Sequence, residues 1–200
     1  MKRLSVGSAV PNDTKTKILR GALDLISKVG ISKLTVEEVA LNCDVSRMTI
    51  YRYFPKGKDQ LLSEVIAAEA FEWLEQLMEH VSCYDNFEDV AVYGLMFARR
   101  KLLEHRVLNK ILEEEPEALL PMLTIEANRI IAFIHLYVVT QLFKVKLSEN
   151  LNADEVAEYL ARMLLSVVIS PGSWDLTQEA EVRLLVRTQF LAVLNPPEPS

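Results

Sequence analysis

Between positions 46 and 54 the sequence gathers side chains whose chemistry suits the surface of a nucleic acid duplex. The members of this set are Arg47, Met48, Thr49, Tyr51, Arg52 and Tyr53. Arginine can donate paired hydrogen bonds to guanine O6 and N7 or bind a phosphate, methionine and threonine can contact a thymine methyl group, and tyrosine hydroxyls suit phosphate oxygens. The segment is therefore predicted to contact DNA, with core packing as the alternative for the two tyrosines.

A short helix is needed to present these side chains, and the neighbouring residues predict one. Ser46 is a favoured helix N-cap and Pro55 a helix terminator, so we expect a helix over residues 47–54. Ile50 and Phe54 are four positions apart and fall on one face of that helix. Burial of this apolar face would point the arginines and tyrosines outward.

Two preceding helices are expected to supply the surface on which this helix packs. Residues 14–30 carry an apolar stripe that ends at a glycine suited to a left-handed cap: Ile18, Ala22, Leu25, Ile26, Val29 and Gly30. Thr35 and Glu38 form a capping-box pattern, which predicts a second helix from Thr35 to about Asn42. Two short helices joined by such a brief turn constitute a helix-turn-helix, a motif whose second helix reads the DNA major groove.

Taken in order, these pieces resemble the TetR-type (tetracycline-repressor-like) transcriptional regulators. The resemblance extends from about Thr14 to Ile66. It rests on Ile18-Leu19-x-x-Ala22 with Gly30, on Leu34-Thr35-Val36-x-x-Val39-Ala40, on Val45-Ser46-x-x-Thr49-Ile50-Tyr51-x-Tyr53-Phe54, and on Lys58-Asp59-x-Leu61-Leu62. Two features depart from the family pattern: Asp44 replaces the usual turn glycine, and the segment from Pro55 to Lys58 is one residue longer than the commonest spacing.

The resemblance implies separate roles for the residues of this region. Three would hold phosphates, namely Thr35, Tyr51 and Lys58. Five would approach bases or the nearby backbone, namely Arg47, Met48, Thr49, Arg52 and Tyr53. Independently of the resemblance, Thr35 and Ser46 start helices, where free backbone amides favour an anion. Simple capping is the alternative for both residues, and the two roles are compatible.

Charge is divided unevenly along the 200 residues. Residues 1–60 contain eleven lysines and arginines against six acidic residues, whereas residues 61–200 contain eleven against twenty-two. The overall charge of −6 therefore combines +5 in the first part with −11 in the second. A basic N-terminal part favours a polyanionic partner there, and the alternative is that solvated helix faces simply differ in composition.

Residues 67–196 are expected to form a helical body that follows an N-terminal domain of residues 12–66. We expect helices over about 58–82, 88–104, 107–114, 124–147, 153–170 and 177–194, with a turn at 116–121, hence an all-α fold of about nine helices. Apolar stripes on the last two helices predict a two-fold dimer interface, as is usual in TetR-like proteins, formed by Tyr159, Met163, Val167, Val182 and Val186. The alternative is that these stripes only face their own body.

The body also combines aromatic and polar residues in a manner typical of a small-molecule pocket. These residues are Tyr93, Met96, Phe97, His105, Arg129, Phe133 and Tyr137. The family resemblance implies an effector pocket here, for a ligand that we expect to be apolar, whereas plain core packing is the alternative. No histidine or cysteine spacing in the sequence matches a metal site, so we expect no cofactor.

Together these features predict a cytoplasmic homodimer that represses transcription from a palindromic operator in double-stranded DNA until an effector releases it. Two cysteines without partner spacing suit a reducing compartment, and we expect neither a secretory signal nor a membrane partner. An enzyme is disfavoured because the sequence lacks phosphate-loop, dinucleotide and nucleophile-elbow motifs, and the acidic run Glu113-Glu114-Glu115 suggests a solvated helix end. A helical protein–protein adaptor without DNA binding remains the alternative function.

Overall fold

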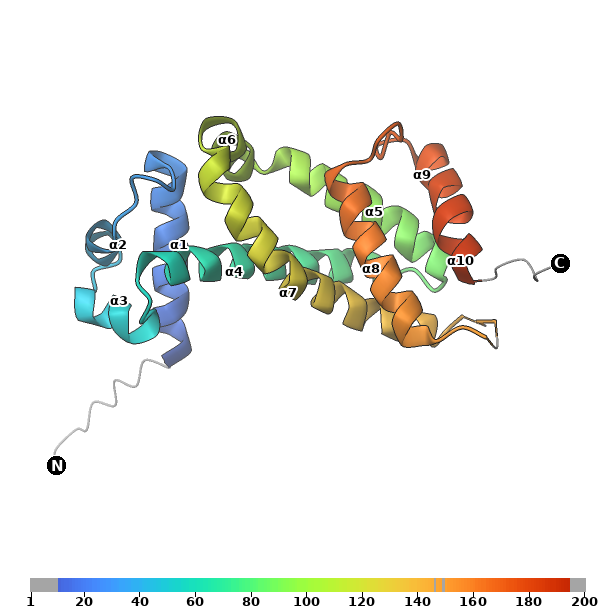
Figure 1. Cartoon of the computed structure of the whole chain (residues 1–200), viewed down its shortest axis with the longest axis horizontal. Coiled ribbons are helices and arrows are strands. Elements are labelled where there is room, and N and C mark those ends of the chain that lie inside the picture. The colour runs from blue at the N-terminus through green and yellow to red at the C-terminus, as the bar shows by residue number, and fades with distance from the viewer. Residues whose placement is uncertain (1–10, 146, 149, 195–200) are drawn as a thin grey trace, which may run out of the picture. The chain divides into compact units, whose positions relative to one another are not determined.

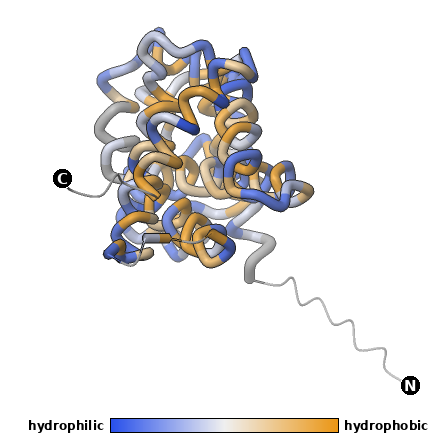
Figure 2. Tube along the Cα trace, turned by 90° about the vertical axis from the view of Figure 1, so that its right-hand side faces the viewer, coloured by the Kyte–Doolittle hydropathy of each residue, from blue (hydrophilic) through white to orange (hydrophobic). Residues whose placement is uncertain are grey.

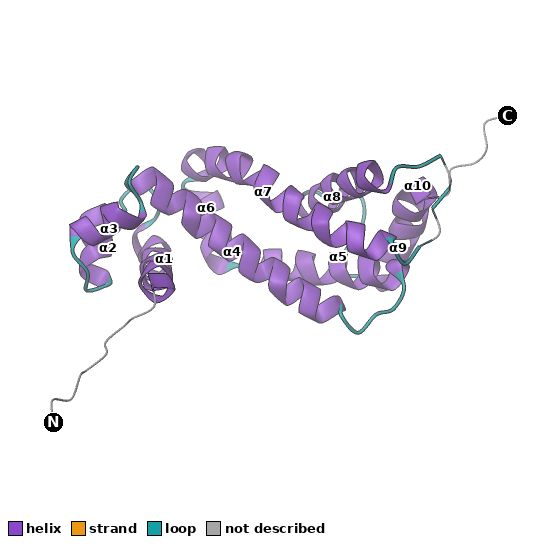
Figure 3. Cartoon of the chain, turned by 90° about the horizontal axis from the view of Figure 1, so that it is seen from below, coloured by secondary structure: helices purple, strands orange, loops and turns teal. Residues whose placement is uncertain are grey.

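The computed structural model describes residues 11–145, 147–148 and 150–194, and each secondary-structure element within these ranges is helical (Figure 3). The helices are α1 (Pro11–Val29), α2 (Val36–Asn42), α3 (Arg47–Tyr53), α4 (Lys58–Val81), α5 (Phe87–Glu104), α6 (Arg106–Glu114), α7 (Pro116–Leu142), α8 (Ala153–Ile169), α9 (Glu179–Leu185), a π-helical turn (Val186–Leu191) and α10 (Ala192–Leu194) (Figure 1). The predicted all-α fold is confirmed. Hydrophobic and hydrophilic residues alternate along the helices (Figure 2), and none of the helices so described is long and apolar enough to cross a bilayer.

The chain folds as two compact units. Unit 1 contains Met1–Ala68 and Lys110–Thr124, and unit 2 contains Glu69–Asn109 and Ile125–Ser200. The sequence did not associate residues 110–124 with the N-terminal part. Helix α4 has its first turns in unit 1 and the remainder in unit 2.

Unit 1 is built around the apolar stripes of its first four helices. Its most deeply buried side chains include Ile18, Ala22, Ile26, Leu34, Val39, Ile50, Phe54, Leu61 and Leu62. Ile50 and Phe54 thus face inward as predicted, and burial of a large apolar side chain of this kind is worth roughly 1.5–3 kcal/mol. Helix α3 is therefore anchored on one side, which leaves its other side to solvent.

The turn between α2 and α3 closes with a left-handed residue. The Asp44 amide donates to the Leu41 carbonyl at 3.2 Å, and the Val45 amide donates to the Ala40 carbonyl at 3.0 Å. This pair of hydrogen bonds is a Schellman motif, whose left-handed position is most often glycine. Asp44 has a φ of 49°, and among the described residues it alone combines a positive φ with a side chain. The backbone at Asp44, where the family pattern has glycine, is therefore strained.

Unit 2 is held by a core to which α5, α7, α8 and α9 contribute. Its buried side chains include Val92, Leu95, Leu142, Leu160, Val182, Leu185, Val186 and Phe190. At the edge of this core, the Arg183 guanidinium of α9 lies 2.9 Å from Glu88 and 2.8 Å from Asp89 at the start of α5. Hydrogen bonds from Asn86 and Arg183 lower the pKa of the Asp89 carboxyl. The ion pairs thus join α9 to α5.

Three segments differ from the sequence prediction. The helix predicted over 124–147 ends at Leu142. Residues 116–121, predicted as a turn, form the start of α7, because Pro116 occupies the first helical position, where its missing amide proton costs no intrahelical hydrogen bond. Near the C-terminus, the helix predicted over 177–194 begins only at Glu179. The π-helical turn at Val186–Leu191 then divides it into α9 and α10.

Replacing Asp44 by glycine is expected to stabilise unit 1. Relief of the left-handed strain is worth roughly 1–2 kcal/mol, and the greater freedom of glycine in the unfolded chain offsets about 0.5–1 kcal/mol of that gain. Urea unfolding should therefore give Asp44→Gly a slightly higher free energy of unfolding than wild type. Asp44→Val should give a lower one, because a β-branched side chain tolerates this conformation poorly. Equal unfolding midpoints for the three proteins would contradict the strained turn.

Candidate nucleic-acid interface

Helix α3 is short, with an N-cap hydrogen bond at its start and buried side chains on its inner side. The Ser46 hydroxyl accepts a hydrogen bond from the Thr49 amide at 3.0 Å and lies 2.9 Å from the Thr49 hydroxyl. Ser46 is thus the N-cap that the sequence predicted. On the inner side, Ile50 and the C-cap residue Phe54 have no exposed surface. These contacts fix both the beginning and the rotation of the helix.

The outer side of α3 carries the residues predicted to contact DNA. Arg47, Met48, Tyr51 and Arg52 are exposed, and Thr49 and Tyr53 are half-buried. Met48 is 77% exposed and Tyr51 40%, so core packing does not account for Tyr51. The Arg52 guanidinium lies 5.2 Å from the centre of the Tyr53 ring, a cation–π contact at the protein surface. The arrangement presents hydrogen-bond donors and apolar atoms side by side.

Arg47 has a carboxylate partner that the sequence did not reveal. Its guanidinium contacts the Glu37 carboxylate of α2 at 2.5 Å, and both side chains are more than half exposed. Exposed ion pairs contribute about 0–1 kcal/mol, because water and salt screen them. A phosphate or a guanine edge can therefore replace Glu37 as the partner of Arg47 at little energetic cost.

The N-terminus of α2 shows the predicted capping box. The Thr35 hydroxyl accepts a hydrogen bond from the Glu38 amide at 3.2 Å and donates to the Glu38 carboxylate at 2.8 Å. The Thr35 amide donates to the same carboxylate at 3.1 Å. Capping is thus confirmed as a role of Thr35. A phosphate at this point would have to compete with Glu38 for the hydroxyl proton.

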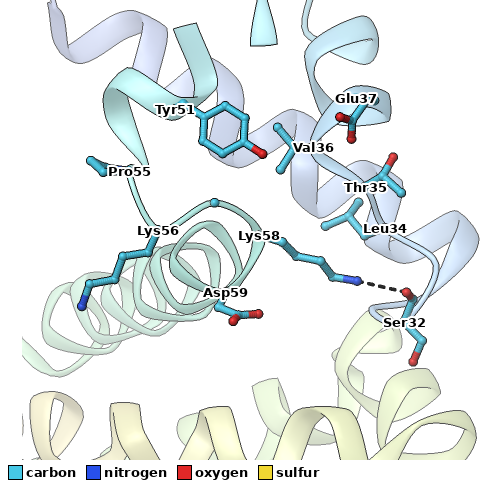
Figure 4. Close-up of a pocket in the computed structure, with 11 residues that line it drawn as sticks. Ser32, Leu34, Thr35, Val36, Glu37, Tyr51, Pro55, Lys56, Lys58 and Asp59 are labelled. Carbon is cyan, nitrogen blue, oxygen red and sulfur yellow. Dashed lines mark hydrogen bonds between the residues drawn. The ribbon is translucent and has the colours of Figure 1, made fainter. Parts of the chain in front are cut away.

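Thr35, Tyr51 and Lys58 line one open hollow of about 650 Å³ (Figure 4). The Tyr51 ring and the Lys58 side chain extend to the same side of the turn that joins α3 to α4, whereas Lys56 points to the opposite side (Figure 4). The Lys58 ammonium donates to the Ser32 carbonyl at 3.0 Å and keeps two further protons for an anion. The structure therefore brings together the three residues that the resemblance assigns to phosphates.

The longer segment before Lys58 closes at Gly57. This residue has a φ of 71°, and its amide donates to the Phe54 carbonyl at 2.8 Å. Its carbonyl accepts from the Leu61 amide at 3.0 Å, which is the first hydrogen bond of α4. A glycine in the left-handed region thus absorbs the extra residue and still starts α4 at Lys58.

The loop that presents Ser32 is held by a carboxylate that was predicted to be solvated. Of the acidic run predicted to be solvated, Glu113 and Glu114 are exposed. One oxygen of Glu115, however, accepts hydrogen bonds from the Ile31 amide at 2.9 Å, the Ser32 amide at 2.9 Å and the Ser32 hydroxyl at 3.1 Å. These hydrogen bonds, that from the Ser32 amide foremost, lower the pKa of Glu115. The interpretation of Glu115 as solvated is wrong, because local sequence carries no signal of a partner 84 positions away.

The residues named for an effector pocket all belong to unit 2, and two of those on α7, Arg129 and Phe133, contact Phe71 of α4. Phe133 packs edge-on against Phe71 of α4, with ring centres 5.3 Å apart, and the Arg129 guanidinium lies 5.8 Å from the centre of the Phe71 ring. Arg129 also pairs at 2.9 Å with Glu126, a buried carboxylate that the sequence analysis missed because nothing in its spacing marks burial. Tyr137 is half-buried, and burial raises the pKa of its hydroxyl.

On α5, Tyr93 and Met96 contact other side chains of unit 2. The Tyr93 hydroxyl donates to the Glu179 carboxylate of α9 at 3.2 Å, and its ring stacks on Tyr84 with centres 4.4 Å apart. Met96 packs against the core of the unit. Packing and hydrogen bonding within the chain therefore occupy both side chains.

Phe97 and His105 are the remaining residues named for an effector pocket, and both contact residues of α4. Phe97 stacks on His80 with ring centres 4.6 Å apart. His105 accepts a hydrogen bond from the Leu108 amide at 2.9 Å through Nδ1, while its Nε2 lies 3.5 Å from the Glu69 carboxylate. Within the described ranges, histidine, cysteine and carboxylate side chains form no group of three that could hold a metal ion.

Burial separates the five residues named for a dimer interface. Val182 and Val186 have no exposed surface and Val167 is 8% exposed, and all three belong to the core of unit 2. In a single copy of the chain, unit 2 itself thus covers these three side chains, because an apolar stripe identifies a face that must be covered but not the neighbour that covers it. Tyr159, 45% exposed, lies at the surface, and Met163 is half-buried beside the core.

Comparison with known proteins bears on unit 1 first. Residues 18–65 match the family model described as bacterial regulatory proteins of the tetR family. This segment runs from α1 through the helix-turn-helix into α4, and it includes each residue proposed above to face DNA. No curated protein matches the sequence.

Solved structures share the fold over nearly the whole chain. The TetR family repressor AlkX from Dietzia sp. strain DQ12-45-1b, implicated in biodegradation of n-alkanes, is 18% identical with a TM-score of 0.66, over 94% of this chain and 100% of that chain. The transcriptional repressor QsdR of the TetR family from R. erythropolis is 17% identical with a TM-score of 0.63, over 95% and 100%. RolR in complex with resorcinol is 19% identical with a TM-score of 0.55, over 94% and 96%. At these identities the likeness shows the fold.

Replacing Thr35 by alanine is expected to destabilise unit 1 by about 1 kcal/mol, because the hydroxyl that accepts from the Glu38 amide and donates to the Glu38 carboxylate is lost. Thr35→Ser should retain nearly the full stability, since its hydroxyl can make the same hydrogen bonds. The free energies of unfolding in urea test this difference. A Thr35→Ala protein as stable as wild type would show that the N-cap hydroxyl contributes nothing.

Proposed function

We propose that this chain, whose residues 18–65 form the N-terminal domain of the tetR family of bacterial regulatory proteins, is a cytoplasmic homodimeric repressor that a small apolar molecule releases from a palindromic operator. The family domain and the fold support DNA-binding transcriptional regulation as its general activity. The observation that carries the proposal is the outer face of α3, which presents Arg47, Met48 and Arg52 to solvent next to the hollow lined by Tyr51 and Lys58.

Each part of this face suits a different part of a duplex. Arg47 and Arg52 can donate to guanine or to phosphate, and Met48 and Thr49 can contact thymine methyl groups. The ammonium of Lys58, beside Thr35 and Tyr51, is positioned to meet phosphate oxygens, which fix the register of a protein on DNA without reading its sequence. The basic charge of residues 1–60 favours the same partner.

Two copies of the chain are required to read one operator. Helix α3 extends only from Arg47 to Tyr53, so a single copy reaches few base pairs. A two-fold dimer presents two such helices to half-sites that are about one helical turn, roughly 34 Å, or a multiple of it apart. Exposed apolar side chains on α8 and α9 support self-association, since Tyr159 is 45%, Ile169 61% and Leu184 54% exposed.

Release by a small molecule is proposed to originate in unit 2. The Phe71–Phe133 pair, with Arg129 and the buried Glu126, combines aromatic and polar side chains, the composition typical of a ligand site. RolR, which shares the fold, has been solved with resorcinol, so a protein of this fold can bind a small molecule. Such a ligand lowers operator affinity by its preference for the conformation that does not bind DNA. Helix α4 belongs to both units, so its movement would carry Lys58.

Selection of random and genomic duplexes by the purified chain tests the proposal. A recovered palindrome whose affinity falls as salt rises would support DNA reading, two-fold symmetry and phosphate contact together, because each neutralised phosphate contributes a slope of roughly −0.9 in log affinity against log salt. If no sequence is enriched and duplex binding is absent or independent of salt, the exposed face of α3 serves another partner, such as a protein.

Arg52→Ala is predicted to weaken binding to the selected operator by roughly 10- to 100-fold, the loss expected for one bidentate base contact. The helical circular dichroism signal and the mass of the dimer should not change, because Arg52 is exposed. Arg20→Ala, which removes the same charge from the exposed surface of α1, is the matched control. An Arg52→Ala protein that loses its fold would instead place Arg52 among the structural residues.

Lys58→Ala is predicted to weaken binding to all duplexes alike and to reduce the salt slope by about one unit, because a phosphate contact carries no sequence information. Titration of the operator and of an unrelated duplex at several salt concentrations measures both quantities. Lys28→Ala, which removes an exposed lysine paired with Asp24 on α1, is the control. A change in sequence preference without a change in slope would contradict the phosphate assignment.

A further inference from the structure

The loop between α1 and α2 contains the backbone group that orients Lys58. The carbonyl of Ser32 accepts the hydrogen bond from the Lys58 ammonium at 3.0 Å, and Ser32 itself lines the hollow (Figure 4). Lysine side chains have high rotamer entropy, and a fixed acceptor restricts the positions that the ammonium can occupy. The placement of Lys58 therefore depends on the placement of the Ser32 carbonyl.

That carbonyl is fixed in turn by Glu115. Three donors converge on one carboxylate oxygen: the Ile31 amide, the Ser32 amide and the Ser32 hydroxyl, at 2.9, 2.9 and 3.1 Å. Hydrogen bonds to an ionised acceptor are roughly twice as strong as neutral ones. A second tie comes from the same segment of the chain, since the Lys110 ammonium donates to the Ser27 carbonyl near the end of α1 at 3.2 Å.

The backbone beside Glu115 is shaped to admit its carboxylate. Gly30 ends α1 with a φ of 83°, and a Cβ at this position would lie 2.3 Å from Glu115 Oε1. A side chain at residue 30 would therefore strain the backbone and collide with the carboxylate. The glycine serves both the end of α1 and the approach of Glu115.

A carboxylate near a phosphate-binding hollow is electrostatically unfavourable for DNA binding, so its presence there calls for a compensating role. We propose that Glu115 is a positioning residue for DNA binding: by holding the Ile31 and Ser32 amides, it places the Ser32 carbonyl that aims the Lys58 ammonium at the phosphate. This inference rests on the proposed function. It assigns to Glu115 an effect on affinity that is opposite in sign to the effect of its charge.

The charge of Glu115 and its proposed positioning role should change operator affinity in opposite directions, so substitutions can separate the two effects. Glu114→Ala removes a carboxylate one residue away, exposed and paired only loosely with Lys110 at 4.0 Å, so it should raise affinity for the operator slightly through general electrostatics. Glu115→Ala removes the same charge but should lower operator affinity about fivefold, as expected for the loss of a directly coupled contact. Glu115→Gln keeps an acceptor oxygen for the loop amides, so it should bind at least as tightly as wild type.

A double-mutant cycle with Lys58 separates positioning from general loss of structure. If Glu115 acts through Lys58, Glu115→Ala should have almost no effect on operator affinity in the Lys58→Ala background. Its own salt slope should fall toward that of Lys58→Ala. Free energies of unfolding, measured on the same proteins, report the structural cost separately, because that cost should persist in both backgrounds.

The outcomes are distinguishable from a failure of the proposed function. A wild-type chain that binds no duplex in a salt-dependent manner overturns the proposed function, and this inference with it. A wild-type chain that binds an operator, together with a Glu115→Ala protein that binds as tightly as Glu114→Ala or loses the same factor of affinity with and without Lys58, overturns the inference alone. Reduced affinity of Glu115→Ala, non-additivity with Lys58→Ala and rescue by Glu115→Gln support it.

Discussion

Burial of Ile50 and Phe54 is the constraint on which the DNA-facing side of unit 1 depends. A helix of seven residues does not persist in water through its own hydrogen bonds, so α3 depends on the burial of these two side chains in unit 1. The same packing fixes its rotation. Arg47, Met48 and Arg52 face solvent as a direct consequence, and the face that they form needs no rearrangement of the core before it can meet a partner.

The acidic side chains of unit 1 show how a negative group can be tolerated beside a predicted polyanion site. Glu38 completes a capping box, Glu37 pairs with Arg47, and Glu115 holds the loop that carries Ser32. Each of these carboxylates has a donor within unit 1: Thr35 for Glu38, Arg47 for Glu37 and Ser32 for Glu115. The positive charge of the N-terminal residues therefore acts on a surface where these three carboxylates are already engaged.

Features encoded within a few residues of one another were predictable from sequence, and contacts between distant segments were not. The starts of α2 and α3 follow from Thr35 and Ser46 because capping hydrogen bonds join residues three positions apart. Asp44 was recognised as unusual because the turn position demands a left-handed conformation. In contrast, the role of Glu115 depends on the distant Ser32, and the burial of Val182 depends on which neighbours cover its helix. Periodicity indicates that a face is apolar, but it does not identify what packs on it.

The central claim, that the outer face of α3 lies against DNA, is tested most directly by arginine-specific chemical modification of the protein with and without its selected operator, read out residue by residue by mass spectrometry. The account predicts that bound operator protects Arg47 and Arg52, while Arg162, exposed on α8, is modified at an unchanged rate. Operator binding that leaves Arg47 and Arg52 as reactive as in the free protein would contradict the account.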